Sequence, residues 1–238
     1  MTGAKQIMQA QAVNNNNIAN VNTVGFRSDT FSFASLPIYG PGYATRVNAV
    51  AADSGTNLSS GVLGSTIRAL DVAINGNGFI AVQGVDCTEA YTRAGDLQVS
   101  ESGAVTTSGG LQVLSESGPL VIPPSDKVTI GSDGTVSIVP QGLAPDAQSQ
   151  VDRIKLVNPP AKNLQKGVDG LLRLKGGGKA TTDESVTLTS GMLESSNVNA
   201  AQSLVNMIEL QRLYEFQIKS INSTDTNEQS AERLMLTS

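Results

Sequence analysis

Two glycine-rich segments come closest to a spacing that performs chemistry in other proteins. The first is Gly76-Asn77-Gly78-Phe79-Ile80-Ala81, which fits a dinucleotide-binding pattern and has Asp96 where an acidic residue would bind a ribose. That pattern requires a helix directly after the glycines, because the helix N-terminus binds the pyrophosphate, whereas residues 79–82 continue as a strand. The second is Gly176-Gly177-Gly178-Lys179, in which Ala180 replaces the hydroxyl residue of a phosphate-binding loop. We therefore expect no nucleotide cofactor.

The chain also lacks the residues that most hydrolases and zinc sites need. It has no histidine and a single cysteine, Cys87. This excludes Ser-His and Cys-His nucleophile pairs, zinc sites built on His or on Cys alone, and a disulfide within the chain. Acidic residues are scattered singly, so a pair of glycosidase carboxylates has no positive support, although the sequence leaves it open. We predict no enzyme activity, no catalytic residue, no cofactor and no metal site.

Composition limits the partners. The net charge is −5 and no run of Lys or Arg occurs, so neither nucleic acid nor an anionic membrane has a docking face. No stretch approaches a membrane span, and the first twenty or so residues lack the apolar core of a Sec signal peptide. We expect no nucleic-acid partner, no membrane insertion and no cleaved Sec signal.

The middle of the chain indicates strands and glycine turns. Aromatic residues make up only 4% of the 238 residues, and 24 are glycine. Alternating apolar residues from Leu70 lead into Asn75-Gly76-Asn77-Gly78, which predicts a hairpin between residues 70–75 and 79–82. Two further hairpins are predicted around the turns at 100–103 and 131–134, and strands at 153–157 and 171–174. We predict a central Gly-rich antiparallel β domain over residues 67–190.

Both ends of the chain carry helical heptad spacing instead. We predict helices over residues 3–20 and from about 197 to 220, with a second short helix over 226–236. Apolar and small polar residues recur at steps of four and three, which is the spacing of a coiled-coil seam. The seam residues are Ala4, Ile7, Gln11, Asn14, Ile18 and Val21 at one end, and Leu204, Met207, Gln211, Tyr214, Ile218 and Ile221 at the other.

The two helices cannot be stable alone. Burying an apolar seam side chain contributes about 2 kcal/mol, whereas ordering each residue of the backbone costs about 1–2 kcal/mol. The C-terminal helix is also apolar beyond its seam, at Val205, Ile208, Leu210, Leu213 and Phe216, so it must contact several neighbours. Neighbours from other copies would make a ring or a filament. The alternative is that both helices fold onto the β domain as an ordinary core.

The predicted organisation is therefore α+β, mostly β with terminal helices that pair as a coiled coil. Residues 1–30 and 191–238 form the assembly segments. Residues 31–66, rich in Pro, Gly, Ala and Ser, are predicted to be an extended linker rather than a packed element. The assembly interface is assigned to Ile7, Asn14, Ile18, Val21, Leu204, Met207, Ile208, Tyr214, Ile218 and Ile221.

Three motifs in order along the chain resemble those of the rod and hook proteins of the bacterial flagellar basal body. The N-terminal motif is Asn16-Asn17-Ile18-Ala19-Asn20-Val21-Asn22-Thr23-Val24-Gly25-Phe26-Arg27. The central motif joins residues 70–79 with Tyr91-Thr92-Arg93-Ala94-Gly95. The C-terminal motif joins residues 191–199 with Met207-Ile208-Glu209-Leu210-Gln211-Arg212-Leu213-Tyr214-Glu215. The ending, residues 216–219 and 231–236, is most similar to the proximal-rod members of that family.

The resemblance implies a structural subunit of the hollow rod that crosses the periplasm and transmits motor torque. Its partners would be its own copies and other flagellar rod proteins. Members of this family are exported unfolded by the flagellar type III apparatus, their terminal helices form the inner tube, and the β domain lies outside. The family normally has a few more residues ahead of the position of Met1, so the resemblance implies a late start or a trimmed helix here.

Two other interpretations stay open at this point. The chain could be a distal-rod or hook subunit of the same family. From a different class, it could be a secreted β-rich carbohydrate-binding or hydrolase domain with helical additions, which would need a concave site with clustered carboxylates or aromatic side chains.

Overall fold

The computed structural model describes residues 2–37, 47–142 and 147–236 of the chain. Its contacts divide the chain into two compact units. The terminal unit is built from the segments Met1–Val21, Ser28–Asn57 and Val198–Ser238. The β unit is built from Asn22–Arg27 and Leu58–Asn197. Each unit is described by itself below.

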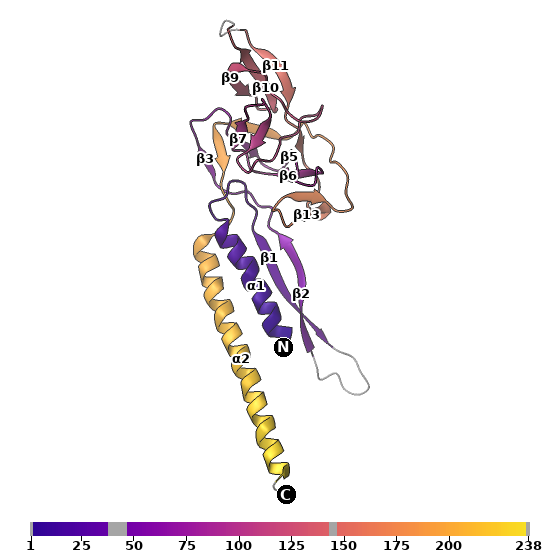
Figure 1. Ribbon diagram of the computed structural model, residues 1–238, viewed down its shortest axis with the longest axis vertical. Coiled ribbons are helices and arrows are strands. Elements are labelled where there is room, and N and C mark those ends of the chain that lie inside the picture. Colours follow the sequence, from indigo (N-terminus) through magenta and orange to yellow (C-terminus); the bar gives the residue numbers. More distant parts are fainter. Residues whose placement is uncertain (1, 38–46, 143–146, 237–238) are drawn as a thin grey trace. The chain divides into compact units, whose positions relative to one another are not determined.

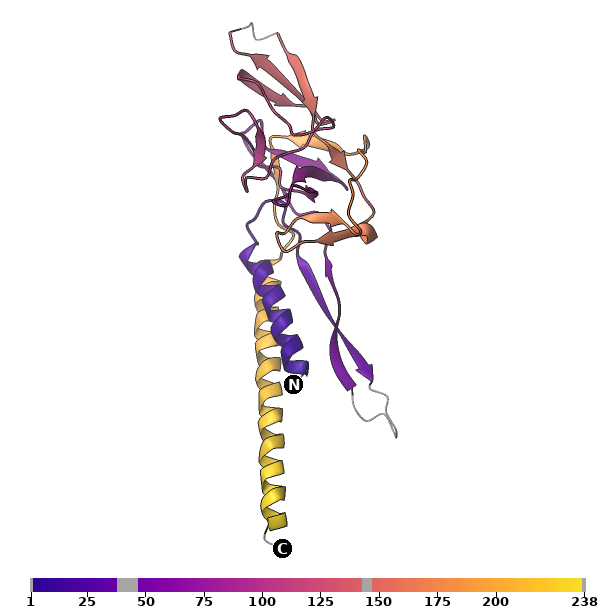
Figure 2. The same cartoon turned by 45° about the vertical axis from the view of Figure 1, so that its right-hand side comes forward.

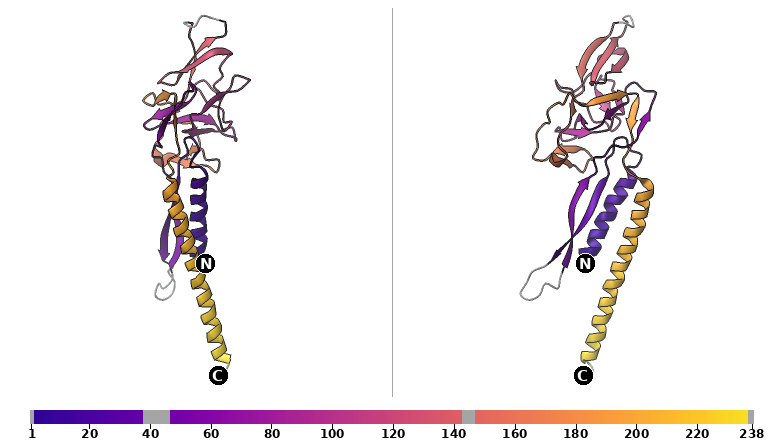
Figure 3. Two further views of the ribbon diagram at one scale, coloured as in Figure 1. Left: turned by 90° about the vertical axis from the view of Figure 1, so that its left-hand side faces the viewer. Right: turned by 180° about the vertical axis from the view of Figure 1, so that it is seen from behind.

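The terminal unit contains the two α-helices of the described residues and a β-hairpin. Helix α1 spans Thr2–Ala19 and helix α2 spans Ala200–Leu236. The helices lie side by side and antiparallel, and α2 continues past the first turn of α1 (Figures 1 and 3). The side chain of Asn199 accepts a hydrogen bond from the backbone N–H of Gln202 at 3.1 Å, which satisfies one free donor at the start of α2.

Helix α2 is continuous, so the predicted interruption between residues 220 and 226 is wrong. The segment Asn222-Ser223-Thr224-Asp225-Thr226-Asn227 suggested a break because each of these residue types favours caps and turns over helix interiors. In the structure, Thr224 Oγ1 donates to the carbonyl of Ser220 at 3.0 Å and Ser230 Oγ donates to that of Thr226 at 2.8 Å. These hydroxyls therefore bond to the backbone one turn earlier while the helix continues.

The segment predicted to be an extended linker contains a long hairpin over most of its described residues. Strand β1, Asp29–Pro37, pairs antiparallel with β2, Val47–Thr56, with a register shift between Thr30 and Ser32 (Figure 2). Residues 38–46, where Gly40-Pro41-Gly42 supported the linker prediction, lie outside the described residues. The alternation of Phe31 and Phe33 with small polar residues was the overlooked strand signal.

The β unit contains fourteen further strands and one short 3-10 helix, η1, among its described residues. Their bounds are β3 Leu63–Ser65, β4 Val72–Asn75, β5 Phe79–Gln83, β6 Glu89–Thr92, β7 Leu97–Val99, β8 Val105–Thr107, β9 Ser125–Ile130, β10 Thr135–Pro140, β11 Ser149–Arg153, β12 Leu156–Val157, η1 Ala161–Asn163, β13 Leu164–Lys166, β14 Leu172–Leu174, β15 Thr187–Ser190 and β16 Met192–Glu194.

These strands form small antiparallel sheets (Figure 1). The largest has five strands in the order β12-β5-β6-β14-β13, and a three-stranded sheet has the order β11-β10-β9. Two-stranded sheets pair β15 with β4, β16 with β3 and β7 with β8. The predicted hairpins β7–β8 and β9–β10 are confirmed. So is the fold class, mostly antiparallel β with a helix at each end.

The Asn-Gly turn after β4 does not make the predicted hairpin. Gly76 and Gly78 have positive φ of 72° and 135°, so the chain does turn here. However, β4 pairs with β15 and β5 pairs with β6 and β12, so the turn passes the chain from one sheet to another. A Cβ on Gly78 would lie 2.6 Å from Val186 Cγ1, which shows how closely the turn packs against the segment before β15.

The core of the β unit is aliphatic. The larger cluster of buried apolar side chains comprises Val72, Ile74, Ile80, Val82, Ala90, Leu97, Val105, Val113, Leu120, Ile122, Ile130, Val136, Ile138, Ile154, Leu156, Leu171, Val186 and Leu188. A second cluster on the other side of the five-stranded sheet comprises Phe79, Ala81, Tyr91, Val157, Leu164 and Leu172. Both faces of β5 are therefore buried, which explains its unbroken apolar sequence.

Three turns of the β unit share one hydrogen-bond pattern and backbone conformation. Cys87 occupies a position that is glycine in the other two turns. The turns 84–88, 131–135 and 167–171 each have an Asp at the third position, whose side chain accepts the N–H two residues on. The fourth position has a left-handed backbone, with φ of 85° at Gly134 and 79° at Gly170. In the first turn this position is Cys87, with φ of 58°. A residue with a Cβ is strained there.

We expect Cys87→Gly to raise the free energy of unfolding by up to about 1 kcal/mol, because glycine adopts this backbone without steric cost. Denaturant unfolding of the full chain measures the change. Cys87→Ala is the matched control, since it removes the thiol but keeps the Cβ and should leave stability nearly unchanged. Equal gains from both variants would show that the thiol, and not the backbone conformation, lowers stability.

Candidate assembly surface

The contact between α1 and α2 is held by polar side chains as much as by apolar ones. Asn14 is buried, and its Nδ2 donates to the backbone carbonyl of Ser203 at 2.8 Å. Ser203 is also buried. Near the other end of α1, a Cβ added to Gly3 would lie 3.4 Å from Oε1 of Gln217. A directional hydrogen bond and close backbone approach therefore set the register of this antiparallel pair.

The residues along the contact keep heptad spacing. Every second one, however, lies one residue earlier in the chain than predicted. On α1 the buried residues are Ala10, Asn14 and Asn17, and on α2 Ser203 is buried while Leu210 and Gln217 are half-buried. Ala10, Asn17, Ser203, Leu210 and Gln217 each lie one residue before a position that the pattern had selected, whereas Asn14 was selected itself. Apart from Leu210, these residues are small or polar, so a search for apolar spacing does not favour them.

The predicted interface residues therefore fall into two groups. Asn14 is buried, and six others are half-buried in the terminal unit: Ile7, Ile18, Val21, Met207, Tyr214 and Ile221. The remaining three, Leu204, Ile208 and Ile218, are exposed. The structure of one chain thus brings the first group together within the terminal unit and leaves the second group on its surface.

Sequence reasoning missed Asn17, which ties α1 to the hairpin. Its Oδ1 accepts the backbone N–H of Asp29 at 2.9 Å, and its Nδ2 donates to the carbonyl of Asp29 at 2.8 Å. One side chain therefore satisfies both backbone groups at the first residue of β1. The signal in the sequence was an Asn one helical turn from Asn14 inside a helix, where Asn is otherwise unfavourable.

Helix α2 also exposes large apolar side chains on more than one side. Leu204 and Ile208 lie one turn apart and are both about half-exposed, and Phe216, one turn beyond Leu213, is 74% exposed. Val205 and Ile218 are exposed too. From Asn222 to Arg233 every residue is exposed. A helix that is apolar on several sides requires more than one neighbouring element.

A groove of about 440 Å³ lies within the terminal unit, between the two helices and β1. Its walls combine Phe31 and Phe33 of β1 with Leu210 and Leu213 of α2. The rings of Phe31 and Phe33 lie edge to face, with centroids 4.9 Å apart. This groove extends the apolar surface of α2 onto the hairpin.

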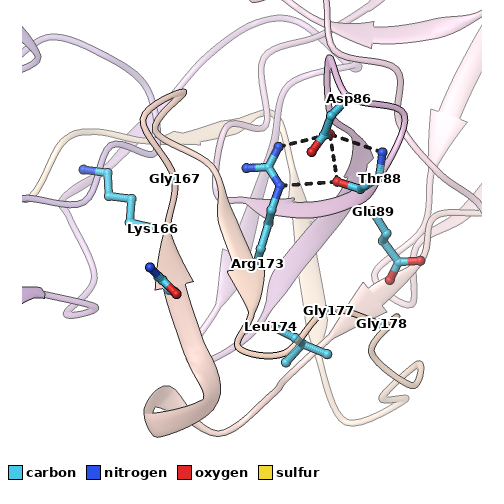
Figure 4. A pocket seen from close by; sticks show the side chains of 10 residues that line it. Asp86, Thr88, Glu89, Lys166, Gly167, Arg173, Leu174, Gly177 and Gly178 are labelled. Atoms are coloured by element: carbon cyan, nitrogen blue, oxygen red, sulfur yellow. Dashed lines mark hydrogen bonds and ion pairs between the residues drawn. The ribbon is translucent and has the colours of Figure 1, made fainter.

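A second pocket, of about 380 Å³, lies in the β unit and is the place to look for a hydrolase site (Figure 4). Arg173 crosses it and bonds to Asp86, which lines the pocket, and to Asp169. Its Nη2 is 2.7 Å from Asp169 Oδ2 and 3.3 Å from Asp86 Oδ1, and its Nε is 3.3 Å from Thr88 Oγ1. The Arg173 side chain therefore links the two turns 84–88 and 167–171.

The electrostatics of this pocket oppose acid–base catalysis. A hydrogen bond from the Thr88 hydroxyl lowers the pKa of Asp86, and one from Arg173 lowers the pKa of Asp169. Hydrogen bonds to Asp169 and Asp86 raise the pKa of Arg173. A glycosidase acid needs a carboxyl group with a raised pKa, and these two aspartates are shifted the other way. The arrangement suits a structural ion-pair network.

Metal clusters and membrane-spanning helices can both be sought in the part of the chain that the structure describes. That part contains no cluster of three or more His, Cys, Asp or Glu side chains that could hold a metal ion. Neither α1 nor α2 has an apolar stretch sufficient to cross a bilayer, judged over the described residues.

Comparison with known proteins identifies two family regions. Residues 73–138 match the family model described as the flagellar hook protein FlgE/F/G D1 domain, and residues 189–234 match that of the flagellar basal body rod FlgEFG protein C-terminal region. The predicted central and C-terminal motifs fall largely within these two matches. The first match lies within the β unit. The second begins at the end of the β unit and continues along α2.

Whole-chain relatives give the same result. The flagellar basal-body rod protein FlgF of Salmonella typhimurium is 37% identical over 241 residues, covering 99% of this chain and 96% of the relative. FlgF of Escherichia coli is 36% identical over the same coverage. The rod protein FlgG of Bacillus subtilis is 34% identical over 94% of this chain and 93% of the relative. The similarity to FlgF confirms the resemblance found in the sequence.

The contact between Asn17 and Asp29 makes a testable contribution to the terminal unit. We expect Asn17→Ala to lower the free energy of unfolding by about 1–3 kcal/mol, because both backbone groups of Asp29 lose their partner. Denaturant unfolding followed by helical circular dichroism measures this loss. Asn15→Ala, at an exposed position of the same helix, should be neutral or slightly stabilising because alanine favours helix. Equal effects of the two variants would contradict the assignment.

Proposed function

This chain belongs to the family of flagellar hook and basal-body rod proteins, and from that membership we propose that it is a structural subunit of the proximal rod. In this role it polymerises through its terminal segments with its own copies and with other rod proteins, and the assembled rod transmits torque for motility. The observation that carries the proposal is the exposed apolar surface of α2, including Leu204, Ile208 and Phe216.

The physical argument for assembly is the incomplete burial of the terminal unit. Ala10 is the one apolar side chain that is fully buried there among the described residues. Each exposed Leu, Ile or Phe of α2 gains about 1.5–3 kcal/mol when it is covered. Contacts between different faces of successive copies produce a helical filament when the rotation does not close into a ring.

The proposed division of labour follows the sequence. Residues 1–30 and 191–238 supply the assembly segments, residues 31–66 connect them to the rest of the chain, and residues 67–190 form the outer domain. The interface uses Leu204, Ile208 and Ile218, which are exposed in one chain. It also uses the half-buried positions Ile7, Ile18, Val21, Met207, Tyr214 and Ile221 and the buried Asn14, which align the helices that carry them.

The remaining parts of the proposal concern export and chemistry. The subunit leaves the cell through the flagellar type III export apparatus without a cleaved Sec signal, and it neither inserts into the membrane nor binds nucleic acid. It is not an enzyme. Asp86 and Asp169, held by Arg173 with lowered pKa values, support this last point.

A distal-rod role is the second candidate, and the 34% identity to FlgG of Bacillus subtilis is the observation that favours it. The position of the protein in dissected basal bodies separates the two. A proximal-rod subunit lies between the export gate and the distal rod, so it should remain in basal bodies that have lost the distal rod and hook. Its disappearance with those parts would favour the distal-rod role.

We expect Ile208→Lys to prevent incorporation into the rod while leaving the isolated chain folded. Ile208 is 53% exposed in one chain, so the added charge costs the monomer little, but it would be buried in the assembled interface. Immunoblots of isolated basal bodies and soft-agar swimming measure the effect. Gln211→Lys, at an exposed polar position of the same helix, is the control. Normal incorporation of Ile208→Lys would remove this residue from the interface.

We also expect amide exchange to separate the free and assembled states of α2. In purified monomer the amides of residues 222–233 should exchange at least about tenfold faster than those of residues 203–217, because only the latter pack on α1. In isolated rods both segments should be protected. Strong protection of residues 222–233 in a proven monomer would argue against assembly-dependent order.

A further inference from the structure

The chain passes between its two units at four places, and the β-unit side of three of them is bonded to one small region. The boundaries fall at Val21/Asn22, Arg27/Ser28, Asn57/Leu58 and Asn197/Val198. Inside the β unit, residues 25–27 and 194–197 adjoin two of these boundaries, and residues 61–62 lie a few residues after a third. We call these three stretches the exit segments.

All three exit segments meet at Glu194, the last residue of β16. Its side chain is fully buried, and its Oε1 accepts hydrogen bonds from Arg27 Nη2 at 2.6 Å and from the backbone N–H of Gly61 at 2.7 Å. Its backbone carbonyl accepts the N–H of Gly25 at 2.8 Å. Glu194 itself lies in the segment before α2, and it binds both the segment after α1 and the segment after β2.

The backbone around Glu194 reinforces this junction. Ser195 N–H donates to the carbonyl of Val62 at 2.9 Å, and Asn197 N–H donates to that of Phe26 at 3.3 Å. A Cβ on Gly61 would lie 2.0 Å from the carbonyl oxygen of Ser195, so only glycine permits this approach. The exit segments therefore run in contact with one another and not only with the carboxylate.

Arg93 attaches the junction to the main sheet of the β unit. It follows β6 directly, and its Nη1 lies 3.0 Å from Glu194 Oε2. Its Nη2 donates to the carbonyl of Gly76 at 2.7 Å, and its guanidinium lies 5.3 Å from the centre of the Phe79 ring at the start of β5. The exit segments are thereby fixed to β5 and β6, the centre of the five-stranded sheet.

This cluster is not the arrangement that stability alone would favour. Two buried guanidinium groups share one carboxylate, and the buried nitrogens Arg27 Nε, Arg27 Nη1 and Arg93 Nε have no hydrogen-bond partner. Burial lowers the pKa of Arg93, which shows that its charge is held against a desolvation cost. Buried ion clusters are commonly no more stable than apolar side chains of similar size, and directional geometry is what they add.

We propose that Glu194, Arg27 and Arg93 form a clamp whose role is to hold the exit segments in one geometry, so that force entering from the terminal segments is passed directly into the central sheet of the β unit. The proposal rests on the proposed function, since only a torque-bearing subunit needs such a connection. Glu194, Arg27 and Arg93 are positioning residues in this role, and the assembly surface itself is elsewhere.

Arg27→Met tests the clamp without emptying the core. The substitution leaves Glu194 paired with Arg93 and with Gly61 N–H, and it removes two of the three unpartnered nitrogens. We expect the melting temperature of the β unit to change by no more than about 4 °C. We expect the amides of Gly25 and Asn197 to exchange about tenfold faster, while that of Gly61 stays protected as an internal reference.

In cells that carry this variant as their sole copy, we expect normal amounts of the protein in isolated basal bodies but a loss of swimming that grows with added viscosity. Arg153→Met is the matched control, because Arg153 pairs with the exposed carboxylates of Glu116 and Glu184 in the same unit. Arg27→Lys should restore part of the swimming, since a lysine can still pair with Glu194.

Three results would overturn the clamp. The first is unchanged exchange at Gly25 and Asn197 in Arg27→Met. The second is swimming equal to that of Arg153→Met at every viscosity despite faster exchange. The third is a melting temperature that falls far enough to account for the swimming defect, which would make the cluster a stabilising core element. If the wild-type protein is itself absent from basal bodies, the proposed function fails, and the force-transmitting role fails with it even when the exchange results hold.

Discussion

The structure depends on an unequal distribution of buried apolar side chains between its two units. Helix α2 has 37 residues and helix α1 has 18, and they pack side by side over only part of the longer helix. Among the residues whose burial the structure describes, Ala10 is the one buried apolar side chain of the terminal unit, whereas the other buried apolar side chains lie in the β unit, most of them in its two clusters. The terminal unit holds its elements together with polar contacts such as those of Asn14 and Asn17, and keeps its large apolar side chains outside.

That distribution explains why the two units use different kinds of residue. Inside the β unit, apolar side chains make up most of the buried core, and ion pairs such as those of Arg173 link turns near the surface. In the terminal unit, small and amide side chains allow α1 and α2 to approach and fix their register, because a directional bond tolerates only one alignment. The larger Leu, Ile and Phe side chains are then left for contacts outside the unit. The inner face of the seam therefore combines small and polar side chains with half-buried apolar ones such as Ile7 and Met207, while other large apolar side chains lie on the outside.

Much of the fold could be predicted from local patterns. The helices at 2–19 and from 200 onward, and the hairpins β7–β8 and β9–β10, follow from periodicity and turn residues. Predictions failed where a longer-range partner overrides local preference. The Asn-Gly turn at 75–78 joins different sheets because β15, more than a hundred residues later, pairs with β4. Residues 222–227 are helical although each type disfavours it. The seam was displaced because Ala10 and Ser203 carry no apolar periodicity for a pattern search to find.

The cluster around Glu194 could not be predicted from local sequence patterns at all. Arg27, Arg93 and Glu194 are single charges in three distant segments, and nothing in their neighbours marks them as buried. Only the fold brings them together, and there the cluster carries an excess guanidinium and unpartnered nitrogens. A sequence optimised for stability alone would replace it with aliphatic side chains. Since an apolar core tolerates small sliding motions whereas paired charges with defined hydrogen bonds resist them, the choice of charges here favours one geometry for the exit segments within the β unit. The hydrogen bonds of Asn14 and Asn17 likewise fix the register of α1 against α2 and β1. Both units therefore use polar groups where the relative position of two segments must be fixed.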